Sequence, residues 1–139
     1  MDKIPKVNVD ILVKKDNKIL LGLLTEKWNF QEKRVYGVPG RDIRFGEKIG
    51  ETVKRNIKEE FDCDVTEYKI ICVNANYALE NHYIGIGVIA KINGEPENLI
   101  PEDWEKWEWF DKNKIPDNLF PATKNLIASY LNHKITVSE

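Results

Sequence analysis

The strongest periodic pattern in the chain is a stripe of apolar residues spaced four apart within residues 38–63. The stripe consists of Ile49, Val53, Ile57 and Phe61. An α-helix advances about 100° per residue, so these side chains fall on one face and predict an amphipathic helix. Asn56, Glu59 and Glu60 share a sector beside the stripe, so the last turn presents two adjacent carboxylates.

Other segments show the apolar patterns that are typical of strands. Residues 7–13 alternate and predict a half-buried strand, while the nearly continuous apolar run 19–24 predicts a strand buried on both faces. Further strands are predicted at 36–38, 64–74, 83–92 and 106–111. Gly85 and Gly87 leave one face of a strand bare, so a helix or a ligand approaches closely there, or the sheet bends.

The polar segments between these elements predict loops. They are 25–34, 74–81, 95–103 and 116–121. A terminal helix is predicted over 122–131, and residues from His133 onward are predicted to fray. Its predicted buried side consists of Leu126, Ile127, Tyr130 and Leu131. The order strands, helix, strands, helix fits one α+β domain over 1–139, with a helix on each side of a mixed sheet. The pattern alone does not distinguish this from other α+β arrangements.

Composition narrows the classes of function. The 139 residues are 42% hydrophobic and 32% charged, with a net charge of -2, which argues against a general nucleic-acid coat. No apolar run approaches the length of a membrane span, and the first ten residues lack the apolar centre of a signal peptide. Cys63 and Cys72 are too few for a disulfide framework and lack metal-site spacing. We therefore expect a reduced, cytoplasmic protein that binds neither a nucleic-acid polymer nor a membrane.

The two glutamates at the end of the predicted helix are the first candidates for chemistry. Acidic groups are disfavoured at a helix end by about 0.3–1 kcal/mol each when exposed, and Glu59 and Glu60 also repel one another. A divalent cation would offset that cost, because Mg²⁺ is usually held by one or two carboxylates plus substrate phosphates. The alternative is a solvated charged face on which Lys54, Arg55 and Lys58 are helical partners.

The spacing of this segment resembles the signature of the Nudix hydrolases, G-x5-E-x7-R-E-U-x-E-E-x-G-U, where U is a bulky aliphatic residue. The chain keeps Glu47, Arg55, Ile57, Glu59 and Glu60. It departs from the signature at Arg41, Asn56, Asp62 and Cys63. The flanking residues 38–40 and 45–47, together with His82-Tyr83 and Trp107-Glu108-Trp109, are similar to the MutT-like nucleotide diphosphatases. The resemblance covers about residues 7 to 131.

This resemblance implies a Nudix α/β/α sandwich with a mixed β-sheet between helices. It also implies hydrolysis of a pyrophosphate bond in a nucleoside triphosphate or another nucleoside diphosphate linked to X. The cofactor would be Mg²⁺, with Mn²⁺ as a possible substitute, and relatives often pair as homodimers. The implied metal ligands are Glu59, Glu60, Glu47 and the carbonyl of Gly40. The implied catalytic set is Glu47, Arg55, Glu59 and Glu60.

Several further residues are candidates for orientation and substrate binding. Arg55 is expected to orient a carboxylate, and by helical spacing its best partner is Glu59 or Glu51. Arg41 either grips a phosphate with its guanidinium fork or is a surface arginine that the turn tolerates. Three more candidates for substrate binding lie in the predicted loops or at a strand start. They are Trp28, Tyr77 and His82. Trp28 either stacks on a nucleobase or closes over the core.

Asn56 stands where many relatives carry a carboxylate that binds metal or acts as general base, and an amide does neither. One hypothesis keeps catalysis, with another base such as Glu47, Glu102 or His82. A second is a GDP-sugar hydrolase of the GDP-mannose type, which releases free sugar instead of a nucleoside monophosphate. A third is a non-catalytic Nudix module that senses a nucleotide.

Overall fold

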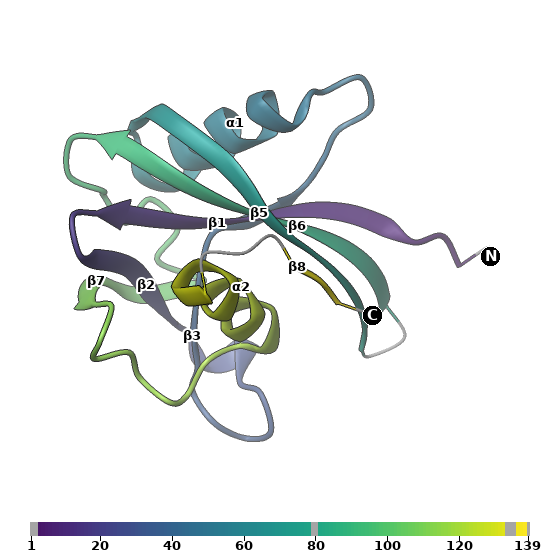
Figure 1. Ribbon diagram of the computed structural model, residues 1–139. Helices are drawn as coiled ribbons and strands as arrows, with labels where there is room; N and C mark the ends of the chain where they lie inside the picture. Colours follow the sequence, from purple (N-terminus) through teal and green to yellow (C-terminus); the bar gives the residue numbers. More distant parts are fainter. Residues whose placement is uncertain (1–2, 79–80, 133–135, 139) are drawn as a thin grey trace.

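The computed structural model describes residues 3–78, 81–132 and 136–138. The described residues form an eight-stranded mixed sheet that lies between helix α1 (Ile49–Phe61) and helix α2 (Pro121–Asn132), as Figure 1 shows. The strand order is β3-β2-β1-β6-β5-β8, with β4 paired to β1 and β7 paired to β2. The predicted Nudix sandwich is therefore confirmed.

The strands have the following bounds. They are β1 (Lys6–Lys15), β2 (Lys18–Leu24), β3 (Tyr36–Gly37), β4 (Gly40–Asp42), β5 (Asp64–Ala78), β6 (Asn81–Asn93), β7 (Trp104–Asp111) and β8 (Thr136–Ser138). β1 runs parallel to β6 and β5 runs parallel to β8, whereas β4 is antiparallel to β1 and β7 is antiparallel to β2. A short 3₁₀ turn at Glu26–Trp28 interrupts the predicted loop 25–34.

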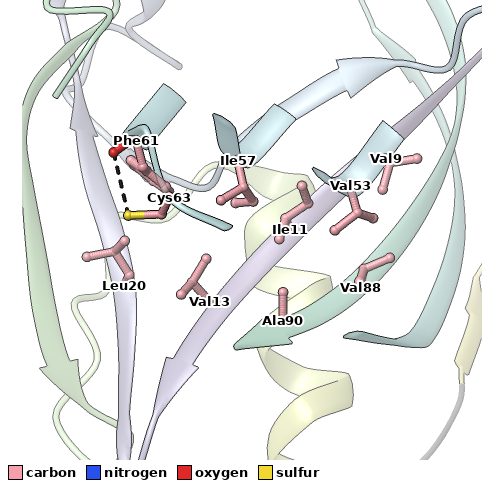
Figure 2. Packing of buried hydrophobic residues seen from close by; sticks show 10 residues of the cluster. All are labelled: Val9, Ile11, Val13, Leu20, Val53, Ile57, Phe61, Cys63, Val88 and Ala90. Atoms are coloured by element: carbon pink, nitrogen blue, oxygen red, sulfur yellow. Dashed lines mark hydrogen bonds between the residues drawn. The ribbon is translucent and has the colours of Figure 1, made fainter. Parts of the chain in front are cut away.

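Helix α1 packs on one face of the sheet through the apolar stripe that the sequence predicts. Val53, Ile57 and Phe61 are fully buried against Val9, Ile11 and other residues of β1 and β6, as Figure 2 shows. The helix begins after Lys48, whose backbone N–H donates to a carboxylate oxygen of Glu51 at 3.0 Å. It ends at Asp62, which adopts the left-handed conformation with φ 54°. This packing sets the direction in which the last turn of α1 points.

Helix α2 covers the other face of the sheet through a second apolar cluster that includes Leu126, Ile127 and Tyr130. Gly87 of β6 lies below this helix, and a Cβ there would meet Cys72 and stand 2.8 Å from Leu126. Of the three alternatives raised for the bare face, the approach of a helix holds at Gly87, whereas Gly85 faces Asp10 and Asn8. Leu131 is 41% exposed, so its predicted burial is wrong. Leu131 is rotated by about 100° from the middle of the buried sector of α2, which explains its exposure.

Two further predictions are corrected by the structure, and one strand was not predicted. The segment 74–81 is not a polar interruption, because β5 continues to Ala78 and pairs with β6 as far as Ala78 opposite Asn81. The backbone hydrogen bonds between β5 and β6 stabilise the strand here, and a solvent-exposed strand tolerates polar side chains. The tail is not frayed at 136–138, which pair with β5 opposite Cys72–Asn74. Strand β4 was not predicted, because three residues carry no periodicity.

The remaining predictions concern cysteines and membranes. Cys63 and Cys72 are buried and free, as the expected reduced state requires. Among the described residues, neither the length nor the hydropathy of any helix is sufficient to cross a membrane.

Candidate active site

A cleft of about 610 Å³ opens where β4, the end of α1 and the start of α2 meet the edge of the sheet. Gly40 and Arg41 line it from β4, and Arg55 and Glu60 line it from α1. Ala122 and Thr123, in the first turn of α2, line the opposite side. Gly40 is required at its position, because a Cβ there would stand 2.4 Å from a carboxylate oxygen of Asp10. The cleft therefore combines residues of several elements that are distant in the sequence.

Glu47 and Arg55 form the tightest ion pair near this cleft. The Arg55 guanidinium donates to both carboxylate oxygens of Glu47, at 2.8 Å and 3.0 Å, and also to the backbone carbonyl of Asp42 at 3.0 Å. Glu47 further accepts from the backbone N–H of Arg44 at 3.0 Å and from the Thr52 hydroxyl at 2.7 Å. These bonds, with Arg55 first, lower the pKa of Glu47 to about 2.

This pairing corrects the sequence-based assignment of the partner of Arg55. The principal partner is Glu47, eight residues earlier, while Glu59 is a longer contact at 3.7 Å. Glu51 is instead used at the helix start, where it accepts from the backbone of Lys48. Helical spacing does not indicate Glu47, because this residue lies in the loop before the helix. Since both oxygens of Glu47 accept from protein donors, this carboxylate is held as a partner for Arg55.

The carboxylates of Glu59 and Glu60 face a group of arginines. Arg41 lies 3.4 Å from Glu60 and 4.0 Å from Glu59, and Arg44 lies 3.8 Å from Glu59. Glu60 is buried, and burial raises the pKa of its carboxyl above its ordinary value, opposed chiefly by the charge of Arg41. Glu59 is more exposed. The end of α1 therefore carries two acids in different environments: Glu59 is exposed to solvent and Glu60 is buried.

Buried polar atoms without a hydrogen bond gather at this end of α1. Among the described residues they include both amide atoms of Asn56, one carboxylate oxygen of Glu60 and Nε of Arg41. Asn56 is fully buried one turn before Glu60 on the same side of the helix. A buried polar group left without a partner costs about 1–3 kcal/mol, so such groups call for a ligand, an ion or a water.

Asp10 is a cleft residue that the sequence analysis did not single out. It lies on β1 opposite Gly40, and the amide of Asn8 donates to its carboxylate at 3.0 Å. Burial raises the pKa of Asp10 to about 7, with the Asn8 bond acting in the opposite direction. In the alternating pattern of residues 7–13, Asp10 falls on the polar face of the strand, so the sequence pattern carried no signal for it.

Aromatic and apolar side chains also line the cleft. Trp28, which is 49% exposed, lines it together with Leu24, Trp104 and Phe120. The indole N–H of Trp28 donates to the carboxylate of Asp103 at 3.0 Å, which holds the ring at the cleft wall. Of the two alternatives raised for Trp28, stacking on a ligand or closing over the core, its exposure favours the first.

The structure brings only some of the predicted site residues to the cleft. Gly40, Arg41, Arg55, Glu60 and Trp28 line it, while Glu47 and Glu59 contact the arginines that do so. Tyr77 and His82 lie instead near the far end of the β5–β6 hairpin, with ring centroids 6.2 Å apart, and neither lines the cleft. Glu102 does not line it either, whereas its neighbour Asp103 does.

The donor atoms at the end of α1 suit a hard divalent cation that is completed by substrate. Within the described ranges, no three His, Cys, Asp or Glu side chains lie close enough together to hold a metal ion by themselves. Two carboxylates, Glu59 and Glu60, are nevertheless adjacent, and one oxygen of Glu60 has no partner in the described structure. Mg²⁺ commonly uses one or two carboxylates and takes its other ligands from phosphate and water. The residues present therefore fit such an ion.

Comparisons with known proteins agree with this architecture. No family model matches the chain. The chain is 32% identical over 132 residues to the ADP-ribose pyrophosphatase of Methanocaldococcus jannaschii, an alignment that covers 94% of this chain and 75% of that protein. It is also similar to the crystal structure of a MutT Nudix hydrolase from Burkholderia pseudomallei, with a TM-score of 0.80, 25% identity and coverage of 91% and 98%. The MutT protein from Methanosarcina mazei Go1 shares the fold, with a TM-score of 0.77 at 16% identity over 96% and 97% of the two chains.

The unpaired amide of Asn56 predicts that the site is less stable than an apolar version of it. Asn56→Val is close in size and in helix propensity but removes both unpaired atoms. We expect it to raise the free energy of unfolding by about 1–3 kcal/mol, measured by urea denaturation without metal or nucleotide. The control is Asn98→Val, which removes a bond of 2.8 Å to the Trp104 carbonyl and should lower stability. A loss of stability in Asn56→Val would show that the amide has a partner.

The low pKa of Glu47 predicts how its ion pair responds to acid. The native carboxyl titrates near 2 and the unfolded one near 4.5, so its contribution to stability is complete above about pH 4.5 and is lost as the pH falls toward 2. We expect Glu47→Gln to be less stable than the wild type at pH 7, with a difference that shrinks below pH 4.5. Urea unfolding between pH 7 and pH 3 measures this. Arg55→Leu should behave alike, and parallel curves for wild type and Glu47→Gln would contradict the assignment.

Proposed function

The chain belongs to the Nudix hydrolases, and we propose that it hydrolyses a pyrophosphate bond in a nucleoside diphosphate linked to a second group, using a divalent cation held by Glu59 and Glu60. The observation that carries this proposal is that one cleft is lined by charged and by aromatic side chains. Arg41, Arg44 and Glu60 are the charged ones, and Trp28 and Phe120 are aromatic. A nucleotide likewise combines charged phosphates with an aromatic base.

The dimensions of the cleft support a substrate of this class. Ligand sites for small molecules commonly enclose about 300–1,000 Å³, and this cleft measures about 610 Å³. Trp28 offers an exposed aromatic face for a base, and Asp103 fixes its orientation. Arg41 and Arg44 also line the cleft, and a guanidinium fork pairs well with phosphate oxygens.

The reaction consists of attack by water on one phosphorus, cleavage of the bridging P–O bond and release of a proton. The products are a nucleoside monophosphate and the phosphorylated second group. Bound at Glu59 and Glu60, a divalent cation would neutralise phosphate charge and acidify a water ligand. Arg55 holds Glu47 and the end of β4, so that Gly40 and Arg41 stay opposite the carboxylates. Arg44 bonds to phosphate oxygens in this scheme.

A general base must lie within reach of the attacking water, so its candidates are carboxylates that line the cleft. Of the earlier candidates, Glu47 has both oxygens occupied and a pKa of about 2, so it is a poor proton acceptor. Glu102 and His82 do not line the cleft. The acidic residues that line it besides Glu60 are Asp10, Asp42 and Asp103.

ADP-ribose is the first substrate to test, because the relative from Methanocaldococcus jannaschii carries that activity in its name. A GDP-sugar hydrolase and a nucleotide-sensing module are the competing functions, and their products separate them. The first releases free sugar, and the second shows binding without turnover. Use of Mn²⁺ in place of Mg²⁺ and a homodimer remain predictions from the family resemblance, and a cytoplasmic location remains a prediction from the sequence composition.

A substrate panel tests the proposal directly. With Mg²⁺ we expect ADP-ribose, and related nucleoside diphosphates linked to X, to give a nucleoside monophosphate detectable by chromatography. Glu60→Gln should lower kcat by about a hundredfold or more, because one of the two carboxylates proposed to hold the divalent cation loses its charge. Glu67→Gln, an exposed carboxylate on β5, is the matched control and should keep full activity. Binding without any product in the wild type would favour the sensing module.

The exposed ring of Trp28 in the cleft predicts that its removal weakens substrate binding. Trp28→Ala removes a stacking surface, so KM should rise about tenfold with little change in kcat. Tyr77→Ala is the control, because Tyr77 is 69% exposed and does not line the cleft. A rise in KM for Tyr77→Ala but not for Trp28→Ala would place the base at the β5–β6 hairpin instead.

A further inference from the structure

Arg41 bridges β4 and the end of α1 and contacts both acids that the proposed function assigns to the cation. One of its terminal nitrogens lies 3.4 Å from Glu60, and its Nε lies 4.0 Å from Glu59. Glu59 also has contacts with Arg55 at 3.7 Å and with Arg44 at 3.8 Å. Within the described ranges, Arg41 is the only cation that forms an ion pair with Glu60. It therefore supplies the positive charge beside the buried acid.

The contacts of Arg41 are loose in comparison with those of Arg55. Charge-assisted bonds between guanidinium and carboxylate measure about 2.7–2.9 Å, a length that Arg55 reaches with Glu47 and that Arg41 does not reach with Glu60. Nε of Arg41 is buried without a hydrogen bond in the described structure. The side chain is 37% exposed and lines the cleft, so it has room to turn toward a ligand. The Arg41 side chain therefore lies beside the carboxylates without a short hydrogen bond that would hold it there.

A guanidinium and a divalent cation cannot share the same carboxylate oxygens without repulsion. Arg41 keeps its charge at any ordinary pH, so it leaves these oxygens only by moving. Its planar fork suits a phosphate as well as it suits a carboxylate. A phosphate entering the cleft thus offers Arg41 an alternative partner, and a move of Arg41 onto it removes the ion-pair partner of Glu60 and one of the three arginines beside Glu59.

We propose that Arg41 is an internal counter-ion that occupies the Glu59–Glu60 pair in the free protein and moves onto the substrate phosphates as the divalent cation binds. This arrangement disfavours cation binding without nucleotide and couples the two ligands. Coupling is reciprocal, so the cation also strengthens nucleotide binding. The inference rests on the proposed cation site, but it concerns binding and does not require turnover.

The test is a titration of nucleotide-free protein with Mn²⁺, followed by electron paramagnetic resonance of the unbound ion. Arg41→Gln should bind Mn²⁺ about tenfold more tightly than the wild type, within the usual 5–150-fold range of coupling between sites. Arg44→Gln is the matched control, because Arg44 contacts Glu59 but has no ion pair with Glu60 in the described structure. Its effect should be clearly smaller.

Equal affinity for wild type and Arg41→Gln, or weaker binding by Arg41→Gln, would overturn the inference. If Mn²⁺ binds neither protein, the inference and the cation part of the proposed function both fall. Product formation from the substrate panel decides the hydrolytic function separately.

A second measurement uses the wild type and so does not depend on how a variant folds. The Nε–H signal of Arg41 in a nitrogen-15 correlation spectrum should shift when Mg²⁺ and α,β-methylene-ADP are added together. The Nε–H signal of Arg55, whose bond to Glu47 is 2.8 Å, is the internal control and should move less. An Arg41 signal that stays unchanged at saturation would show that this side chain does not leave the carboxylates.

Discussion

The ion pair between Glu47 and Arg55 is the interaction on which the geometry of this site depends. One guanidinium holds both oxygens of Glu47, in the loop before α1, and the carbonyl of Asp42, at the end of β4. It thereby ties β4, the loop and the second turn of the helix together. Because β4 has only three residues and pairs with β1 alone, its own hydrogen bonds fix it weakly. Arg55 keeps Gly40 and Arg41 in front of the acids at the end of α1.

The same few elements therefore carry two arginine–glutamate contacts of different kinds. Arg55 and Glu47 are both mostly buried, close and multiply bonded, and the pair serves as a structural tie. Arg41 and Glu60 are farther apart, and the arginine remains accessible from the cleft. Both pairs join a guanidinium to a carboxylate, so they differ in the distance between the two groups and in the number of further hydrogen bonds that each group makes. A site that must release its acids to a cation needs one contact of each kind.

The parts of this fold that local pattern determines were predictable, and the parts that depend on distant pairing were not. The stripe from Ile49 to Phe61 predicted α1, because helical burial has a period that neighbouring residues reveal. The extension of β5 to Ala78 and the pairing of β8 depend on partner strands far away in the sequence. The Glu47–Arg55 pair crosses from a loop to a helix, so helical spacing pointed to the wrong acid. Asp103 and Trp28 are 75 residues apart in the sequence and meet through a hydrogen bond at the cleft, which no local pattern reveals.

The positions of the buried polar atoms without hydrogen bonds indicate that the residues at this end of α1 serve ligand binding at a cost in folding stability. Of the five buried side-chain atoms without a hydrogen bond in the described residues, four belong to Arg41, Asn56 and Glu60. Defects of folding would be scattered through the molecule, whereas these occur on β4 and on one side of the last two turns of α1. Buried polar groups of this kind cost stability, and native structures retain them where function requires them. The amide of Asn56 lies buried one turn before Glu60 without lining the cleft, and it lacks the charge that a carboxylate would bring.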